Sequence, residues 1–130
     1  MRPWSDRPIQ DCLEPLEHLP PPLFRIEPHP YASVGAPYGQ HKDPFRLRSG
    51  VVKRLLEAQD QLRRHQPHLQ FAIFDAWRPI SVQAFMVNYT IDQLCRERGV
   101  DRHDPGQEVD LHNVESEVGR FWAPPSRNPQ

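Results

Sequence analysis

The most chemically specific stretch of the sequence is Asp-Ala-Trp-Arg-Pro at positions 75–79, which follows an apolar run at 71–74. The aromatic and β-branched run is typical of a buried strand, and the fixed φ of Pro79 suits the first position of a following helix. Arg78 would then lie at or just before the N-cap, where the positive end of the helix dipole disfavours a guanidinium. Because functional positions are where local rules are expected to fail, Arg78 is a candidate site residue.

A guanidinium held rigidly at a strand-to-helix corner has a defined chemistry. It can offer two parallel donors to an anion, either a substrate carboxylate or a developing oxyanion. The competing interpretation is structural, because an ion pair between Asp75 and Arg78 could simply close the corner. The local pattern leaves both interpretations open.

Other residue patterns offer less chemistry. The seven histidines form no His-Glu-x-x-His motif, and no cysteine cluster supports a zinc site. Asp101-x-His103-Asp104 and His41-x-Asp43 have metal-like spacing, but they lie in loops that we expect to be solvated. The sequence has no glycine-rich phosphate loop and no Gly-x-Ser-x-Gly elbow. We expect the carboxylates of the third helix to form a solvated face; these are Glu108, Glu115 and Glu117.

Length and composition indicate one domain at most. The chain has 130 residues, and its 16 Lys and Arg against 17 Asp and Glu give a net charge of −1, so no global field draws it to nucleic acid or to anionic lipid. Cys12 and Cys95 are too far apart for a metal or redox motif, and we expect reduced thiols, one of them in the core. With no signal peptide and no apolar run of about 18 residues, we expect a cytoplasmic protein that enters no membrane.

Proline governs the first part of the chain, residues 1–45. Its density allows only short, peripheral strands and no long helix. A disordered polyproline arm is one interpretation. We favour an ordered wrap of extended pieces and turns, because large apolar residues are frequent and Gly35 and Gly39 suit turns. The apolar residues in question are Leu13, Leu16, Leu23, Phe24, Ile26, Tyr31, Val34 and Tyr38.

Residues 46–122 have the pattern helix, strand, helix, helix. An amphipathic stripe predicts a first helix from Ser49, as N-cap, to His65, followed by a strand at about 69–74. A second helix is expected from Pro79 to about Arg98, ended by Gly99, and a third at about 107–122. Residues 123–130 form a Pro-rich connector. The fold class is therefore α+β, and with one clear strand we expect the fold to be incomplete. The residues expected to face the core are Val51, Val52, Leu55, Leu56, Gln59 and Leu62 in the first helix, Val82, Phe85, Met86, Tyr89 and Leu94 in the second, and Leu111, Val114, Val118, Phe121 and Trp122 in the third.

The motif Phe-Asp-Ala-Trp-Arg-Pro at 74–79, followed by Val82-Gln83 and Phe85-Met86, resembles the zinc D-alanyl-D-alanine dipeptidases, which include the vancomycin-resistance enzyme. Residues 8–12, 31–47 and 121–126 are similar to the longer bacterial members, so the resemblance spans essentially the whole chain. The family usually has Tyr where Trp77 stands, and both are aromatic.

The resemblance implies an α+β fold shared with D,D-peptidases and a substrate, the dipeptide D-Ala-D-Ala. It implies one zinc held by two His and one Asp, a Glu as general acid/base, and a corner Arg that stabilises the tetrahedral intermediate. By the match of the motif, that last role would fall on Arg78, the one catalytic residue the resemblance assigns here. It assigns no substrate-binding residue.

The chain departs from the family pattern after its Ala-Pro-Pro-Ser segment at 123–126. The zinc motif Ser-x-His-x-x-Gly-x-Ala-x-Asp and the catalytic Glu of the family come later than Gln130, so no residue here can inherit those roles. We therefore expect the N-terminal part of such an enzyme from a shortened reading frame, binding no zinc and inactive alone, with a C-terminal segment that could be a separate chain.

Three alternatives stay open at this point. One is a non-catalytic module that binds a peptide or D-amino-acid carboxylate through Arg78. Another is an interaction protein whose Pro-rich arm docks into an aromatic groove. The third is a related peptidase that cuts a different bond in cell-wall peptides.

Overall fold

The computed structural model describes residues 8–40 and 42–125. These residues form a mixed α+β structure, in agreement with the expected class. The elements follow in the order β1 (Leu16–His18), β2 (Phe24–Arg25), the 3₁₀ turn η1 (Ala32–Val34), β3 (Arg46–Arg48), α1 (Ser49–His65), β4 (Ala72–Ile73), α2 (Ile80–Arg98), the 3₁₀ turn η2 (Pro105–Gln107) and α3 (Glu108–Phe121).

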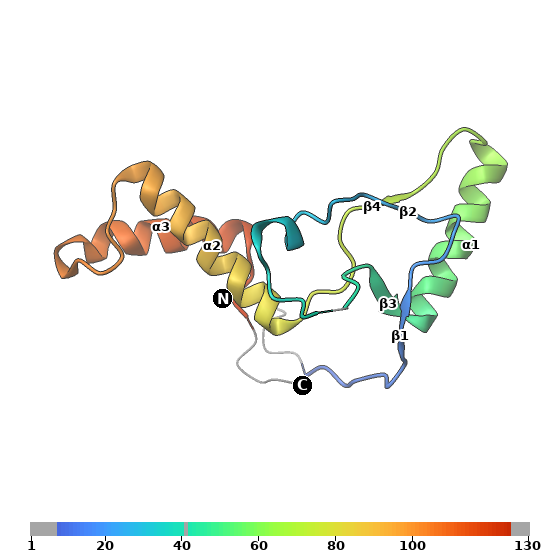
Figure 1. The fold of residues 1–130 in the computed structure, drawn as a ribbon, viewed down its shortest axis with the longest axis horizontal. Coiled ribbons are helices and arrows are strands. Elements are labelled where there is room, and N and C mark those ends of the chain that lie inside the picture. Colours follow the sequence, from blue (N-terminus) through green and yellow to red (C-terminus); the bar gives the residue numbers. More distant parts are fainter. Residues whose placement is uncertain (1–7, 41, 126–130) are drawn as a thin grey trace.

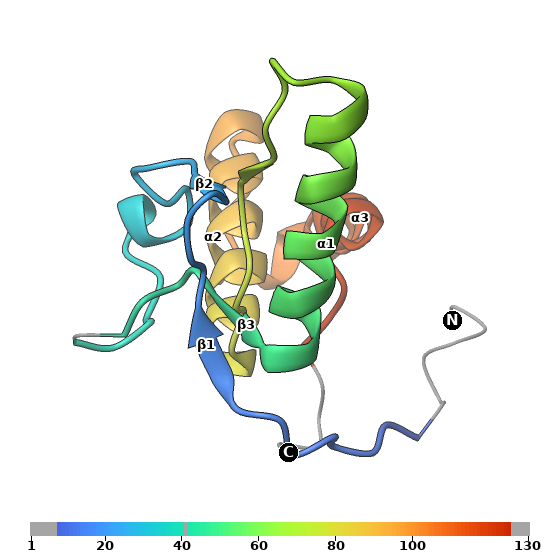
Figure 2. The ribbon, with the colours of Figure 1, turned by 90° about the vertical axis from the view of Figure 1, so that its right-hand side faces the viewer.

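The helices lie at opposite ends of an elongated molecule, with extended segments between them (Figure 1). At one end α1 packs beside β1 and β3, and at the other α2 and α3 form a hairpin (Figures 1 and 2). β1 pairs with β3 antiparallel, and β2 pairs with β4 in parallel. None of the helices in the described ranges is long and apolar enough to cross a membrane.

The first helix has the bounds that its amphipathic stripe predicts, but its N-terminus is capped differently. Ser49 is the first helical residue, and the N-cap position belongs to Arg48, whose side chain makes no cap hydrogen bond. The capping acceptor instead comes from Glu14, whose Oε1 accepts the backbone N–H of Gly50 at 3.0 Å and the hydroxyl of Ser49 at 3.3 Å. A carboxylate is favourable at the positive end of a helix, so a residue far away in sequence replaces the expected local cap. Val52 and Gln59 are buried, whereas Val51 is exposed.

The strand expected at 69–74 is much shorter than predicted. β4 contains only Ala72 and Ile73, and the structure has further short strands in the Pro-rich segment that supply its partner β2. The expectation that this strand is buried was wrong, because Phe74 is 53% exposed. A pair of strands has two faces, and the hydrophobic cluster beside α1 covers only the face that carries Phe71 and Ile73. Phe74 is not covered by that cluster and is therefore exposed.

The Pro-rich segment is built from short strands and turns. Gly35 and Gly39 have φ values of 92° and 84°, a region that glycine adopts without steric cost, as expected of turn residues. Leu23 and Tyr38 from this segment are buried, while Leu13 is exposed. The described part of the segment therefore contributes to two hydrophobic clusters, one against α1 and one against α2.

The second and third helices differ slightly from their predicted bounds. Pro79 is the N-cap of α2 rather than its first residue, and Gly99 ends the helix in the left-handed conformation at φ 67°. In α3, Val114 and Val118 are each 1% exposed and pack against Ile91 and the buried Cys95 of α2. Phe121 had been expected on the same face, but it is 78% exposed.

Phe121 is seven residues after Val114 and three after Val118, which is the spacing of one helix face. Its exposure therefore means that no described residue covers that face at the last turn of α3.

Candidate functional site at the Arg78 corner

Arg78 lies between β4 and α2, immediately before the N-cap Pro79. The corner is fixed to the rest of the molecule because the backbone N–H of Trp77 donates to the carbonyl of Pro44 at 3.0 Å. The ring of Trp77 is itself covered by the guanidinium of Arg46 at 4.2 Å from its centroid. The side chain of Arg78 thus starts from a backbone that is anchored through the neighbouring Trp77.

The guanidinium of Arg78 is surrounded by groups from several parts of the chain. Nε and Nη2 donate to Oδ2 of Asp75 at 3.1 and 2.5 Å. Nη1 donates to Oε1 of Gln83 at 3.1 Å, and Nη2 donates to the hydroxyl of Tyr31 at 3.2 Å. The cation also lies over the rings of Tyr31 and Trp122, at 5.0 and 5.3 Å. The ion pair of the structural interpretation is therefore present, but it is one part of a larger arrangement.

One donor of the guanidinium is still available to a ligand. A guanidinium carries five N–H groups, and the contacts to Asp75, Gln83 and Tyr31 use all but one, on Nη1. That N–H has no partner among the described residues, and 34% of the side chain is exposed. Arg78 can therefore donate to an added anion without losing the bonds that orient it.

The charge of Arg78 is secured by its surroundings. Burial lowers the pKa of Arg78, but the hydrogen bond and the charge of Asp75 outweigh burial and raise the pKa above its ordinary value. Tyr31 has a raised pKa because of burial, against the opposing effect of Arg78. The pKa of Tyr38 is raised further, again mainly by burial and then by Asp75. The corner therefore holds a permanent cation beside neutral phenols.

The segment after α3 is attached to the same corner. Nε2 of Gln83 donates to the carbonyl of Ala123 at 2.6 Å, while its Oε1 receives Arg78. Trp122 meets the ring of Tyr31 edge to face at a centroid distance of 5.4 Å. The chain beyond α3 consequently passes directly beside the guanidinium.

His29 belongs to this arrangement, although no sequence pattern distinguishes it from the other histidines. Its Nε2 lies 3.2 Å from Oδ1 of Asp75, and its side chain is 3% exposed. The contact joins residues 46 positions apart, which no local pattern can indicate. The signal available in the sequence was its position among large apolar residues, between Ile26 and Tyr31.

The other sequence candidates do not come together as a metal site. The Asp101 carboxylate accepts the backbone N–H of His103 at 2.9 Å, and the Asp104 carboxylate accepts that of Gly106 at 2.8 Å, so these carboxylates shape turns. His41 lies outside the described residues, and Asp43 binds His18 and Arg25. No group of three or more His, Cys, Asp or Glu side chains in the described ranges could hold a metal ion. The described residues thus do not fit the zinc that the family resemblance implies.

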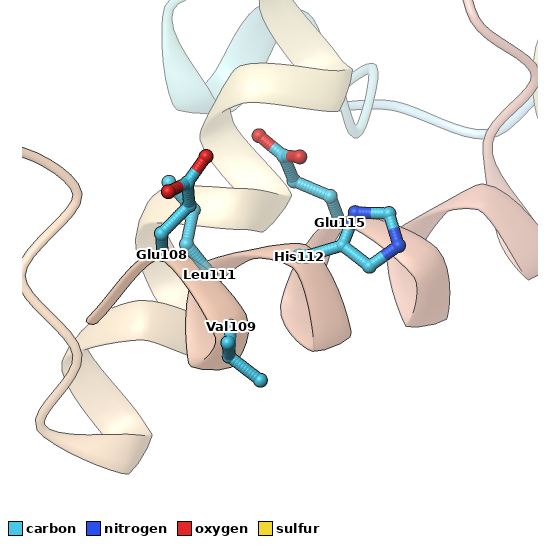
Figure 3. A pocket seen from close by; sticks show the side chains of 5 residues that line it. All are labelled: Glu108, Val109, Leu111, His112 and Glu115. Carbon is cyan, nitrogen blue, oxygen red and sulfur yellow. The ribbon is translucent and has the colours of Figure 1, made fainter. Parts of the chain in front are cut away.

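Two open hollows of the surface lie on the α2–α3 hairpin, away from Arg78. One, of about 400 Å³, is lined by the first part of α3, where Glu108 and Glu115 lie on one side of the helix (Figure 3). Another, of about 370 Å³, is lined by residues between Arg98 and Asn113. The carboxylates of Glu108 and Glu115 are exposed as expected, whereas Glu117 is half-buried and pairs with Arg98 at 2.5 Å.

Comparisons with known proteins give one similarity. The chain is 39% identical to a protein described as D-alanyl-D-alanine dipeptidase from Synechocystis sp., over 132 residues that take in 99% of this chain. The chain spans about half of that relative, 52% of its length, in the N-terminal part. No protein-family model matches the sequence. No solved structure matches it.

Proposed function

We propose that this chain, which is related in sequence to the D-alanyl-D-alanine dipeptidases, supplies the N-terminal part of a dipeptidase that hydrolyses D-Ala-D-Ala, with Arg78 as its oxyanion donor. The relative carries the dipeptidase description, and the similarity takes in the whole Arg78 corner. The observation that carries the proposal is the state of Arg78: a permanent cation, oriented by Asp75, Gln83 and Tyr31, with one N–H and a third of its side chain still accessible.

This arrangement suits amide hydrolysis. When a nucleophile adds to a peptide carbonyl, negative charge develops on the carbonyl oxygen, and a donor already aimed at that position lowers the barrier without reorganising. The Asp75 bond and the two aromatic rings fix the plane of the guanidinium before substrate arrives. The free Nη1 N–H would then donate to the oxyanion.

The metal chemistry of the family is not assigned to any residue here. Because the described residues hold no group of metal ligands, we assign this chain the oxyanion donor and no metal-dependent step. The residues directly after α3 support a division of the site between stretches of chain, since Ala123 accepts a hydrogen bond from Gln83 and Trp122 lies under the guanidinium of Arg78.

A chimera tests the proposal. This chain would replace the matching stretch of the Synechocystis dipeptidase, and release of D-Ala from D-Ala-D-Ala would be measured with added zinc, with L-Ala-L-Ala as the control substrate. We expect D-Ala release by the chimera and none by the isolated 130-residue chain. A folded chimera that leaves D-Ala-D-Ala intact would contradict the proposal, and so would turnover by the isolated chain.

A second candidate is a non-catalytic module that binds a carboxylate through Arg78. The same free N–H favours it, together with the lack of a metal-binding group in the described ranges. Calorimetry on the isolated chain with D-Ala-D-Ala and a chelator separates the two functions. Metal-independent binding that is lost in Arg78→Ala would support the module, whereas no detectable heat is expected if the chain is part of the enzyme.

A further inference from the structure

The side chain of His29 lies directly behind the carboxylate that orients Arg78. Oδ2 of Asp75 accepts the Arg78 hydrogen bonds, while Oδ1 faces Nε2 of His29 at 3.2 Å. The two oxygens of one carboxylate therefore have separate partners, one exposed and one buried.

The hydrogen-bond network assigns the tautomer of His29. Nδ1 receives the backbone N–H groups of Tyr31 at 3.2 Å and Ala32 at 3.3 Å, so it acts as an acceptor and carries no hydrogen. The ring hydrogen must then be on Nε2, the atom that faces Asp75. His29 thus donates to Asp75.

The imidazole has little freedom to move. Rings of Tyr31, Tyr38 and Phe45 meet it edge to face, at centroid distances of 5.4, 5.2 and 5.0 Å. Its backbone is held as well, because the carbonyl of His29 accepts both the N–H and the hydroxyl of Ser33, at 3.0 and 2.8 Å. A donor fixed in this way restricts Asp75 to one rotation.

We infer that His29 is a positioning residue for Arg78: through its Nε2–H it sets the plane of the Asp75 carboxylate and thereby the direction of the guanidinium. A carboxylate without this donor could turn about its Cβ–Cγ bond, and Arg78 would follow it. The consequence for turnover rests on the proposed oxyanion role of Arg78, but the orienting effect itself does not.

Two substitutions separate this role from a purely structural one. His29→Asn keeps an acceptor near the position of Nδ1, so it can still receive the Tyr31 and Ala32 N–H groups, but it is too short to reach Asp75. His29→Gln places an amide donor near the position of Nε2 and loses that acceptor. A positioning role predicts damage from Asn and rescue by Gln, whereas a turn-capping role predicts the reverse.

The direct readout is nuclear magnetic resonance of the Arg78 Nε–H in the isolated chain, without substrate or metal. We expect its exchange with water to be at least about tenfold faster in His29→Asn than in the parent, because the charge-assisted hydrogen bond from Nε of Arg78 to Asp75 is weakened. In His29→Gln we expect exchange close to that of the parent. Equal or larger acceleration in His29→Gln would overturn the inference, as would an unchanged rate in His29→Asn.

A measurement on the unaltered chain tests the inference even if a variant does not fold. Nitrogen-15 shifts of the imidazole are expected to report hydrogen on Nε2 and a bare Nδ1. A ring with hydrogen on Nδ1 would overturn the inference without any substitution.

The last readout tests whether the orientation of Arg78 by His29 affects turnover. In the chimera, His29→Asn should lower kcat with little change in KM, and His29→Gln should restore most of kcat. A chimera without activity, combined with the expected Arg78 exchange, would contradict the proposed function and leave the positioning role standing. Normal kcat in His29→Asn would contradict the consequence of the positioning role for turnover.

Discussion

At the scale of single residues, Arg78 is arranged for more than stability. An ion pair between residues three apart with a third of the cation exposed contributes little to folding, because solvent screens the pair and both side chains lose freedom. The Asp75–Arg78 pair alone would close the corner, yet three further residues, Tyr31, Gln83 and Trp122, add hydrogen bonds and ring contacts to the guanidinium.

Asp43 shows what a carboxylate with a structural role does in this chain. It accepts hydrogen bonds from His18 at 2.6 Å, from Arg25 at 2.8 Å and from the backbone of Phe45 at 2.8 Å. Burial raises the pKa of Asp43, but these bonds and the charge of Arg25 outweigh it and hold the pKa below the ordinary 3.8. In its ionised form the group therefore links β1, β2 and Phe45, the residue before β3.

We predict that this carboxylate makes the fold acid-sensitive. Because its pKa is lower in the folded chain than in the unfolded chain, its stabilisation is present above about pH 3.8 and is lost as pH falls below it toward the folded pKa. Urea unfolding at a series of pH values should show this loss, and Asp43→Asn should be less stable at neutral pH with a shallower acid dependence. An unchanged acid dependence in Asp43→Asn would contradict the assignment.

The residue scale also shows how far the sequence alone reaches. Arg78 could be predicted as a site residue because it breaks a local rule at a helix start, and a few consecutive residues are enough to show this. His29 could not, because its importance comes from burial and from a partner 46 residues away. For the same reason Glu14 replaced Ser49 as the cap of α1: a group brought by tertiary contacts took over from the local candidate.

At the scale of elements, the bounds of a helix could be predicted where they depend on local features, namely its hydrophobic periodicity or a residue that terminates it. The stripe of α1 gave its bounds, and Gly99 marked the end of α2. The strands were harder to predict, since each has only two or three residues and exists through a partner from elsewhere in the chain. The exposed Phe121 and Phe74 have the same origin, because hydrophobicity does not say whether a covering element is present.

A pair of glycine substitutions tests the end of α2. Gly99→Ala adds a methyl group that meets nothing within 4 Å, so its whole effect is the cost of a left-handed φ of 67° for a residue with a side chain, about 1 kcal/mol of destabilisation. The control is Gly119→Ala within α3, whose added methyl group also meets nothing within 4 Å. We expect it to stabilise the fold by about 0.5–1 kcal/mol. Urea midpoints measure both. Opposite signs are expected, and a neutral Gly99→Ala would contradict the conformational argument.

At the scale of the whole molecule, the described residues form separate hydrophobic clusters instead of one core. Phe45 and Val52 belong to the cluster beside α1, Tyr38 and Val82 to the cluster at the Arg78 corner, and the α2–α3 hairpin has its own. The corner cluster combines side chains of the Pro-rich segment and of α2 with Trp122, which follows α3. Arg78 lies beside this cluster, in the connection between β4 and α2.

The site depends on residues from separate parts of the described chain. Tyr31 comes from the Pro-rich segment, Gln83 from α2 and Trp122 from the end of α3, and each contacts the guanidinium. A chimera tests such a site better than a short peptide, because every contributing segment is present.

The most direct test of the account is the kcat of that chimera for D-Ala-D-Ala when Arg78 is replaced by Ala. The matched control is Arg96→Ala, which removes the same charge from an exposed position near the end of α2. We predict that Arg78→Ala lowers kcat by about 10²–10³-fold, the usual effect of losing one oxyanion donor, while Arg96→Ala leaves it unchanged. A kcat that is the same in Arg78→Ala and in the parent chimera would contradict the oxyanion role.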